Sequence, residues 1–244
     1  MNKVIRVMKT HRSIRNFTEK QVDEEVITII LNAARQASTS NFIQAYSIIR
    51  VNDPASRKKI ATLAGNQTWV VECPLFFVFC ADLKRSELAC KMQNRQMLTG
   101  YTEQFIIATV DVALVAQNTM LAAESLGLGG VFIGGIRNDP VQLCEILDIP
   151  EQVYPVFGLC LGYPSDVPEV KPRLPLEVIV KEEKYSFDDL ASIKAYDQTC
   201  NKYYRERSDA SREDNWTKQI ARMTVEPMRP HMKDFIRSKG FDLQ

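Results

Sequence analysis

Cysteine and histidine are scarce, and their spacing excludes two common kinds of site. Six cysteines are spread through 244 residues without a CxxC pair, and the two histidines are His11 and His231. Structural zinc sites need clustered cysteine and histidine ligands, and disulfide frameworks are typical of much smaller chains. We therefore expect reduced thiols and no bound metal.

An excess of charge of one sign and long apolar runs are also lacking. Lys and Arg total 31 against 30 Asp and Glu, a formal net charge of +1 that would not attract a polyanion or an anionic membrane. The longest continuous apolar run, Leu75 to Ala81, has strand length and falls short of the roughly 20 residues of a bilayer span. The first residues show no secretory apolar region. These features predict a cytoplasmic protein without nucleic-acid or membrane partners.

Several familiar catalytic motifs are absent. The sequence contains neither the GxxxxGK[ST] phosphate loop nor the GxSxG of serine hydrolases. The glycine-rich stretch 127–135 has Phe132 in place of the third glycine of GxGxxG, and its order relative to strand and helix is inverted. With two histidines there is little room for an acid–base relay. This shortage favours chemistry carried out by a cofactor that the protein positions.

What the sequence does contain is an ordinary globular composition, with 45% hydrophobic and 25% charged residues. The periodicity of the apolar residues predicts alternating helices and strands, which on pattern alone favours a layered α/β sandwich with parallel strands. The expected helices are 23–37, 54–63, 101–126 and 140–147, and the expected strands are 46–51, 75–81, 131–135 and 156–162, with 177–181 as a candidate last strand. The helix over 101–126 is apolar on most of its circumference, with Asp111, Gln117 and Asn118 as exceptions, so we expect protein to surround it. Beyond Ser186 the chain is polar, charged and predicted to be helical.

Two cationic clusters are candidates for binding an anion. The segment His11-Arg12-Ser13-Ile14-Arg15 combines potential cations with a hydroxyl group, a donor set that suits a phosphate. The segment Lys171-Pro172-Arg173 lies between Pro168 and Pro175, which stiffen its backbone. Each cluster is also compatible with a solvated surface, so neither establishes an anion site by itself.

Polar loops and a pair of glycines add to this set. Hydroxyl and amide side chains gather in 38–44 and 65–67, where they could bond the edge of a heterocycle or serve as caps and turns. Gly134 and Gly135 follow a predicted strand, where their backbone N–H groups could approach a flat ligand, with a β-bulge as the alternative.

Together these segments resemble one family. The chain is similar to the oxygen-insensitive NADPH nitroreductase and NADPH-flavin oxidoreductase branch of the nitroreductase family in the ordered segments HRSIRNFT, ASTSNFIQAYSIIRV, LAGNQ, FFVFCAD, AQNTMLAAESLGLGGVFIGGIRN, FGLCLGYP and VKPRLP. The resemblance implies an α+β fold with a mixed, mostly antiparallel sheet surrounded by helices, which overrides the parallel arrangement. It also implies an intertwined homodimer with two FMN molecules at the interface. Each chain would be a single domain over 1–244 with a helical C-terminal extension from about 186.

The resemblance assigns the two cationic clusters to the same part of the cofactor. His11, Arg12 and Ser13 would hold the phosphate and ribityl chain of FMN. Lys171 and Arg173 would approach that phosphate from another direction. The clusters would then have one shared purpose.

The resemblance also assigns residues to the flavin ring. Arg15 would lie near the N1–O2 edge, where a fixed positive charge stabilises the reduced flavin. Thr39, Ser40 and Gln67 would bond other polar atoms. The residues that would run alongside the ring, with a glycine N–H at N5, are Phe132, Ile133, Gly134 and Gly135. No side chain would act as a nucleophile.

The C-terminal tail is similar to the region that binds the 2′-phosphate of NADPH in this family. Arg207 and Arg212 would be the binding residues, and a charged surface loop is the alternative. Glu213 departs from the pattern and weakens the case for NADPH over NADH. Trp69 departs as well, next to Gln67.

The implied activity is an FMN-dependent oxidoreductase that transfers hydride from NADPH to nitroaromatics, quinones or free flavin by a ping-pong mechanism. A dedicated flavin reductase that supplies reduced FMN to a partner enzyme is one alternative. A flavin-binding sensor or carrier without catalysis is another.

Overall fold

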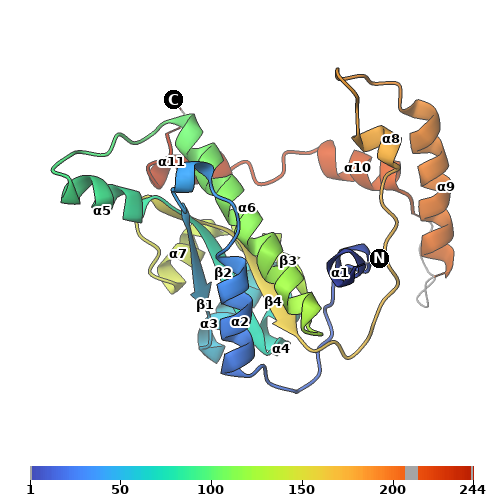
Figure 1. Ribbon diagram of the computed structural model, residues 1–244, viewed down its shortest axis with the longest axis horizontal. Coiled ribbons are helices and arrows are strands. Elements are labelled where there is room, and N and C mark those ends of the chain that lie inside the picture. The colour runs from blue at the N-terminus through green and yellow to red at the C-terminus, as the bar shows by residue number, and fades with distance from the viewer. Residues whose placement is uncertain (1, 207–213, 243) are drawn as a thin grey trace. The chain divides into compact units, whose positions relative to one another are not determined.

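A computed structural model describes residues 2–206, 214–242 and 244 (Figure 1). These residues form two compact units. The first comprises the chain up to Pro168 together with His231–Gln244, and the second is Glu169–Pro230. The prediction of a single domain over 1–244 stays a prediction.

The first unit is built on a four-stranded sheet in the order β1-β2-β4-β3. The strands are β1 (Tyr46–Arg50), β2 (Leu75–Asp82), β3 (Gly129–Ile133) and β4 (Val153–Gly162). All three neighbouring pairs are antiparallel, so the parallel sheet favoured by alternation is wrong and the α+β fold implied by the resemblance is confirmed. Apolar periodicity reports which faces of an element are buried and carries no information about strand direction.

Strand β2 forms the centre of the sheet. All of its residues are buried, and it pairs with β1 on one edge and β4 on the other. Aromatic packing continues across the sheet, since the ring centroids of Phe79 and Phe157 lie 5.9 Å apart. The predicted buried central strand over 75–81 is confirmed.

Helix α6 (Thr102–Ser125) is the main helix of this unit and packs against α2 (Glu24–Ala34) and the sheet (Figure 1). By length and hydropathy α6 would also pass as a membrane span. Its buried side contacts the sheet, as predicted, whereas Ile106, Val110 and Leu114 on another side are 42–49% exposed. The expectation that protein surrounds α6 therefore holds for one side within a single chain.

Smaller helices complete the first unit: α1 (Lys3–Lys9), α3 (Pro54–Leu63), α4 (Trp69–Glu72), α5 (Lys84–Met92), α7 (Pro140–Ile146) and α11 (Met232–Ser238). The sequence pattern did not predict α1 and α5, because neither buries a residue and so neither shows an apolar stripe. Several predicted bounds shift, and the strand predicted over 156–162 begins at Val153. The first long helix ends at Ala34 instead of Ala37, and Gly134 and Gly135 begin the 3₁₀ turn η2 (Gly134–Arg137) instead of ending a strand.

The second unit contains α8 (Leu176–Ile179), α9 (Leu190–Glu206) and α10 (Trp216–Thr224). The candidate strand over 177–181 is wrong, because Val178 and Val180 donate their N–H groups to the carbonyls of Pro175 and Leu176 and so form a helical turn. Packing between α9 and α10 includes Tyr196 and Trp216, whose ring centroids are 6.2 Å apart. The predicted helical character beyond Ser186 is confirmed over the residues that the structure describes.

Candidate functional site

The basic segment 11–15 lies alongside β3. Ser13 and Gly130 form a parallel β-bridge, and the Ile14 N–H donates to the Gly130 carbonyl at 2.9 Å. This approach requires glycine, because a Cβ on Gly129 would overlap the Ile14 side chain, which is buried. The sequence therefore places the potential cations at the edge of the sheet and anchors them through Ile14.

Two members of the segment have partners in the first unit. His11 Nδ1 lies 2.6 Å from Glu124 Oε1 at the end of α6. Arg12 donates from Nε to the Thr10 carbonyl at 2.9 Å and from Nη1 to the Pro168 carbonyl at 3.0 Å. These contacts fix the directions of both side chains.

Arg15 and Gln67 meet at Trp69, the first residue of α4. The Arg15 guanidinium carbon is 5.8 Å from the Trp69 ring centroid, a cation–π arrangement. The indole Nε1–H donates to Gln67 Oε1 at 3.1 Å, and Gln67 Nε2 donates to the Ala64 carbonyl at 2.7 Å. Two predicted cofactor residues, distant in sequence, are thus joined through Trp69.

The glycine pair adjoins this cluster. A Cβ on Gly135 would overlap the Ala64 carbonyl oxygen and lie 2.6 Å from Gln67 Nε2. The backbone at Gly135 therefore approaches Gln67 more closely than any side chain would permit. Upstream, Ile133 is fully buried and offers only its backbone, whereas Phe132 is 36% exposed and packs edge-on against Phe157.

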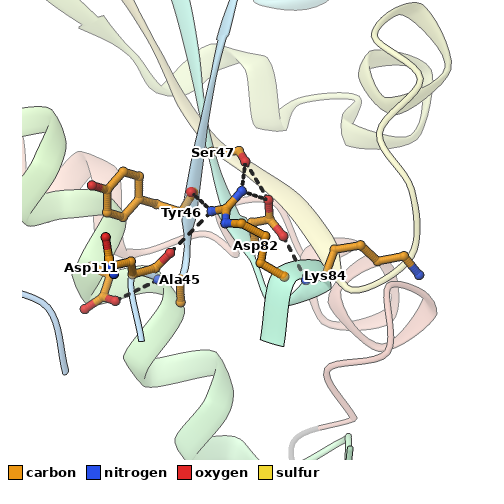
Figure 2. Close-up of polar contacts among 8 residues, drawn as sticks. Ala45, Tyr46, Ser47, Asp82, Lys84 and Asp111 are labelled. Atoms are coloured by element: carbon orange, nitrogen blue, oxygen red, sulfur yellow. Dashed lines mark hydrogen bonds and ion pairs between the residues drawn. The ribbon is translucent and has the colours of Figure 1, made fainter. Parts of the chain in front are cut away.

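The loop that carries Thr39 and Ser40 is fastened by a buried carboxylate. Asp111 of α6 is 0% exposed, and its two oxygens accept the N–H groups of Ser40 at 2.9 Å and Ala45 at 3.0 Å. Figure 2 shows Asp111 pointing to Ala45 at the end of the loop. Within the loop, Asn41 and Phe42 have φ values of 47° and 60°, a strained backbone for residues other than glycine. Asp111 thus holds an unusual loop in one conformation.

A second network follows the same loop. Asp82 at the end of β2 accepts hydrogen bonds from the Ser47 hydroxyl at 2.5 Å and the Lys84 N–H at 2.8 Å (Figure 2). Arg85 pairs with Asp82 at 3.1 Å and donates to the carbonyls of Gln44 and Tyr46. The start of β1 is therefore tied to the end of β2.

Lys171 and Arg173 belong to the second unit. The Lys171 ammonium lies 5.6 Å from the Tyr204 ring centroid, and Arg173 Nη1 donates to the Lys171 carbonyl at 2.8 Å. Their predicted meeting with residues 11–15 stays a prediction. Arg207 and Arg212, the expected NADPH residues, lie outside the described residues.

Sequence reasoning missed the roles of Glu124 and Asp111. Asp111 stood out in the sequence as a charged residue inside a mostly apolar helix. Its partners could not be predicted, because they are main-chain N–H groups, which have no sequence motif. Nothing in the sequence indicated a role for Glu124, because its partner His11 is 113 positions away. Among the described residues no group of three or more potential metal ligands is found.

Comparison with known proteins identifies relatives over the full length. Residues 8–163 match the nitroreductase family, and residues 171–244 match the C-terminal domain of the nitroreductase family. The chain is 41% identical to the FMN reductase (NADPH) of Bacillus subtilis, with 99% of each chain covered. It is also 41% identical to the oxygen-insensitive NADPH nitroreductase of Salmonella typhimurium, again over 99% of each.

Solved structures are similar over the same length. Nitroreductase A from Vibrio parahaemolyticus is 40% identical, with a TM-score of 0.93 and 100% of both chains covered. The NADPH:FMN oxidoreductase of Vibrio harveyi, complexed with NAD+, is 39% identical with a TM-score of 0.92, also over 100% of both chains.

Proposed function

Because the chain belongs to the nitroreductase family, we propose that it is an FMN-dependent oxidoreductase that uses NADPH to reduce nitroaromatics, quinones or free flavin. The observation that carries this proposal is a run of contacts in the first unit. Trp69 contacts Arg15 and Gln67, and Gln67 in turn adjoins the backbone of Gly135. These residues come from three separate motifs and have no other common purpose.

The cluster fits a flavin in its chemistry. A guanidinium and a carboxamide suit the polar edge of a conjugated ring. FMN, when bound, supplies the hydride and electron transfer. Arg15 contributes a fixed positive charge, which favours the reduced flavin and so raises its reduction potential.

The phosphate of FMN would be held by charged and hydroxyl groups. His11, Arg12 and Ser13 supply donors from the first unit, and Lys171 and Arg173 supply cations from the second. The ring would lie along Phe132–Gly135. Thr39 and Ser40, on the loop that Asp111 fastens, would bond further polar atoms.

NADPH is the proposed hydride donor, since two relatives carry that nucleotide in their names. Arg207 and Arg212 would bind its 2′-phosphate. In the proposed ping-pong cycle NADPH delivers a hydride and leaves before an acceptor takes up two electrons. No protein side chain needs to act as a nucleophile.

The working form is proposed to be a cytoplasmic homodimer, with two FMN molecules at its interface. Exposed apolar side chains on α6, Ile106, Val110 and Leu114, form a stripe at helical spacing that a second copy would cover. In the second unit Leu176 and Ile179 are 73% and 62% exposed. Such side chains are expected where chains intertwine.

An anaerobic titration tests the proposal. The purified protein should be yellow and should bleach when NADPH is added without oxygen. A colourless protein that takes up no added FMN would refute it. A protein that keeps FMN but is not reduced by NADPH would support the sensor alternative.

Comparison of acceptors addresses the remaining alternative. The family assignment favours a broad oxidoreductase, for which turnover on a nitroaromatic and on free FMN should both be substantial. Turnover on free FMN alone would indicate a dedicated flavin reductase, an activity that the name of the Bacillus subtilis relative contains.

A further inference from the structure

The His11 ring is bonded to a carboxylate from a distant part of the sequence. Its Nδ1 lies 2.6 Å from Oε1 of Glu124, and the two side chains are 29% and 13% exposed. Glu124 stands in the last turn of α6, and His11 follows α1, which packs against α6. The pair is therefore a partly buried contact between two elements and not an incidental surface pair.

Glu124 is unfavourably placed for helix stability. The C-terminal end of a helix carries a partial negative charge, which repels a carboxylate. The hydrogen bond from the His11 ring offsets that repulsion. Since the position disfavours an acidic residue for α6 itself, the contact with His11 is the local feature that explains it.

We propose that Glu124 is a positioning residue for His11, which it orients toward the phosphate of FMN. The inference rests on the proposed function, in which His11 binds that phosphate. By accepting a hydrogen bond from Nδ1, Glu124 fixes the ring plane and makes Nδ1 the protonated nitrogen. Carboxylates orient histidines in the same way in metal sites and in hydrolase triads.

The opposite ring nitrogen is then the one that faces the ligand. The described residues provide no bond to His11 Nε2. As the second N–H of an imidazolium, Nε2 can donate to a phosphate oxygen. The carboxylate sits on the Nδ1 side, so the ring lies between Glu124 and the phosphate and reduces their repulsion.

Nitrogen NMR tests the contact directly, because the chain has two histidines that serve as a matched pair. His231 Nε2 lies 2.9 Å from the Arg137 carbonyl oxygen, which requires a proton on Nε2. In the full-length protein with ¹⁵N-labelled histidine, with and without FMN, we expect Nδ1 of His11 and Nε2 of His231 to be protonated. With FMN bound, Nε2 of His11 should carry a proton as well, since it donates to the phosphate. His231→Gln assigns the signals.

Glu124→Ala should remove the preference for a proton on Nδ1 of His11. Glu124→Gln, whose amide oxygen can still accept a hydrogen bond, should keep that preference. A neutral His11 ring with its proton on Nε2 in the wild type would overturn the proposal.

A double-mutant cycle on FMN affinity tests the consequence. Glu124→Ala should weaken FMN binding about tenfold, because a misoriented His11 loses one charge-assisted contact with the phosphate. Glu124→Gln should weaken FMN binding less. If Glu124 acts through His11, the alanine change should no longer weaken FMN binding in a His11→Ala background. Glu24→Gln, which removes an exposed pair with Arg50 at 2.7 Å, is the control and should change nothing.

The possible results separate this proposal from the proposed function. An undiminished effect of Glu124→Ala in the His11→Ala background, or tighter FMN binding by Glu124→Ala, would overturn the positioning role alone. A wild-type protein that binds no FMN would overturn both. If the alanine variant folds poorly, Glu124→Gln decides, because weakening as severe as that of His11→Ala would contradict orientation by an acceptor oxygen.

Discussion

At the scale of single residues, Gly135 shows how the lack of a side chain shapes the site. Its backbone adjoins both the Ala64 carbonyl and the Gln67 amide, and a Cβ there would overlap the first and crowd the second. Its neighbour Gly134 is different, since a Cβ would lie 3.4 Å from the flexible end of Arg137. The two glycines therefore have unequal tolerance for substitution.

Gly135→Ala should destabilise the protein by about 1–3 kcal/mol, because the new methyl group forces backbone or Gln67 to move. FMN binding should weaken with it, since Gln67 is one of the proposed ligands. Urea unfolding and flavin titration provide the two measurements. Gly134→Ala is the matched control for the unfolding measurement, and equal losses of unfolding free energy in both variants would contradict the account.

The cysteines give a residue-scale prediction that depends on burial. All six are free, and Cys90 is half-buried whereas Cys73, Cys80, Cys144, Cys160 and Cys200 are buried. Burial raises the pKa of Cys80 and Cys160, and the hydrogen bond from Cys160 lowers the pKa of Cys73.

Native protein treated with an aromatic disulfide reagent at neutral pH should release one equivalent of thiolate rapidly, from Cys90. Unfolding should expose all six. Raising the pH should accelerate the rapid phase, since thiolate is the reacting form, and should not recruit Cys80 or Cys160 while the fold persists. Rapid reaction that survives Cys90→Ser would show that the core thiols are accessible.

At the scale of elements, α6 connects the core with the site. Its buried face packs on the sheet, Asp111 fastens the loop of Thr39 and Ser40, and Glu124 bonds His11. One rigid helix thereby positions two separate groups of proposed cofactor ligands.

Asp111→Asn should release that loop. The amide replaces one acceptor oxygen by a donor, so the N–H of Ser40 or Ala45 loses its bond, at a cost of about 1–3 kcal/mol. Hydrogen exchange at these two amides should accelerate, and FMN should bind more weakly. Lys59→Ala, an exposed change on α3, is the control. Unchanged exchange at both amides would contradict the role of Asp111.

The elements also show what the sequence could predict. The strand β2 and the helix α6 were recognisable because long apolar patterns specify burial. The direction of the strands and the helical turn α8 could not be recognised in the sequence, since both depend on which backbone partners are available. The motifs identified Arg15, Gln67 and Gly135 as candidates. The contacts that link them through Trp69 and Gln67, and the contacts of Asp111 and Glu124, arise only from folding.

At the scale of the whole molecule, the proposed FMN site includes a second copy of the chain. Val110→Lys places a charge in the middle of the exposed apolar stripe on α6. It should shift the protein from dimer to monomer in analytical ultracentrifugation and should reduce FMN retention, because the cofactor is proposed to lie at the interface. Leu88→Lys on α5, where the side chain is 57% exposed, should leave a dimer. A wild-type monomer that holds FMN fully would contradict the assembly.

The central claim is that the motifs of both units surround one FMN molecule. A crystal structure of the full chain grown with FMN tests it most directly. We predict the flavin ring beside Gly135 and Arg15, with its phosphate in contact with His11 and with Lys171 and Arg173 of either subunit. A flavin bound elsewhere, or a phosphate that touches neither cationic cluster, would contradict the account.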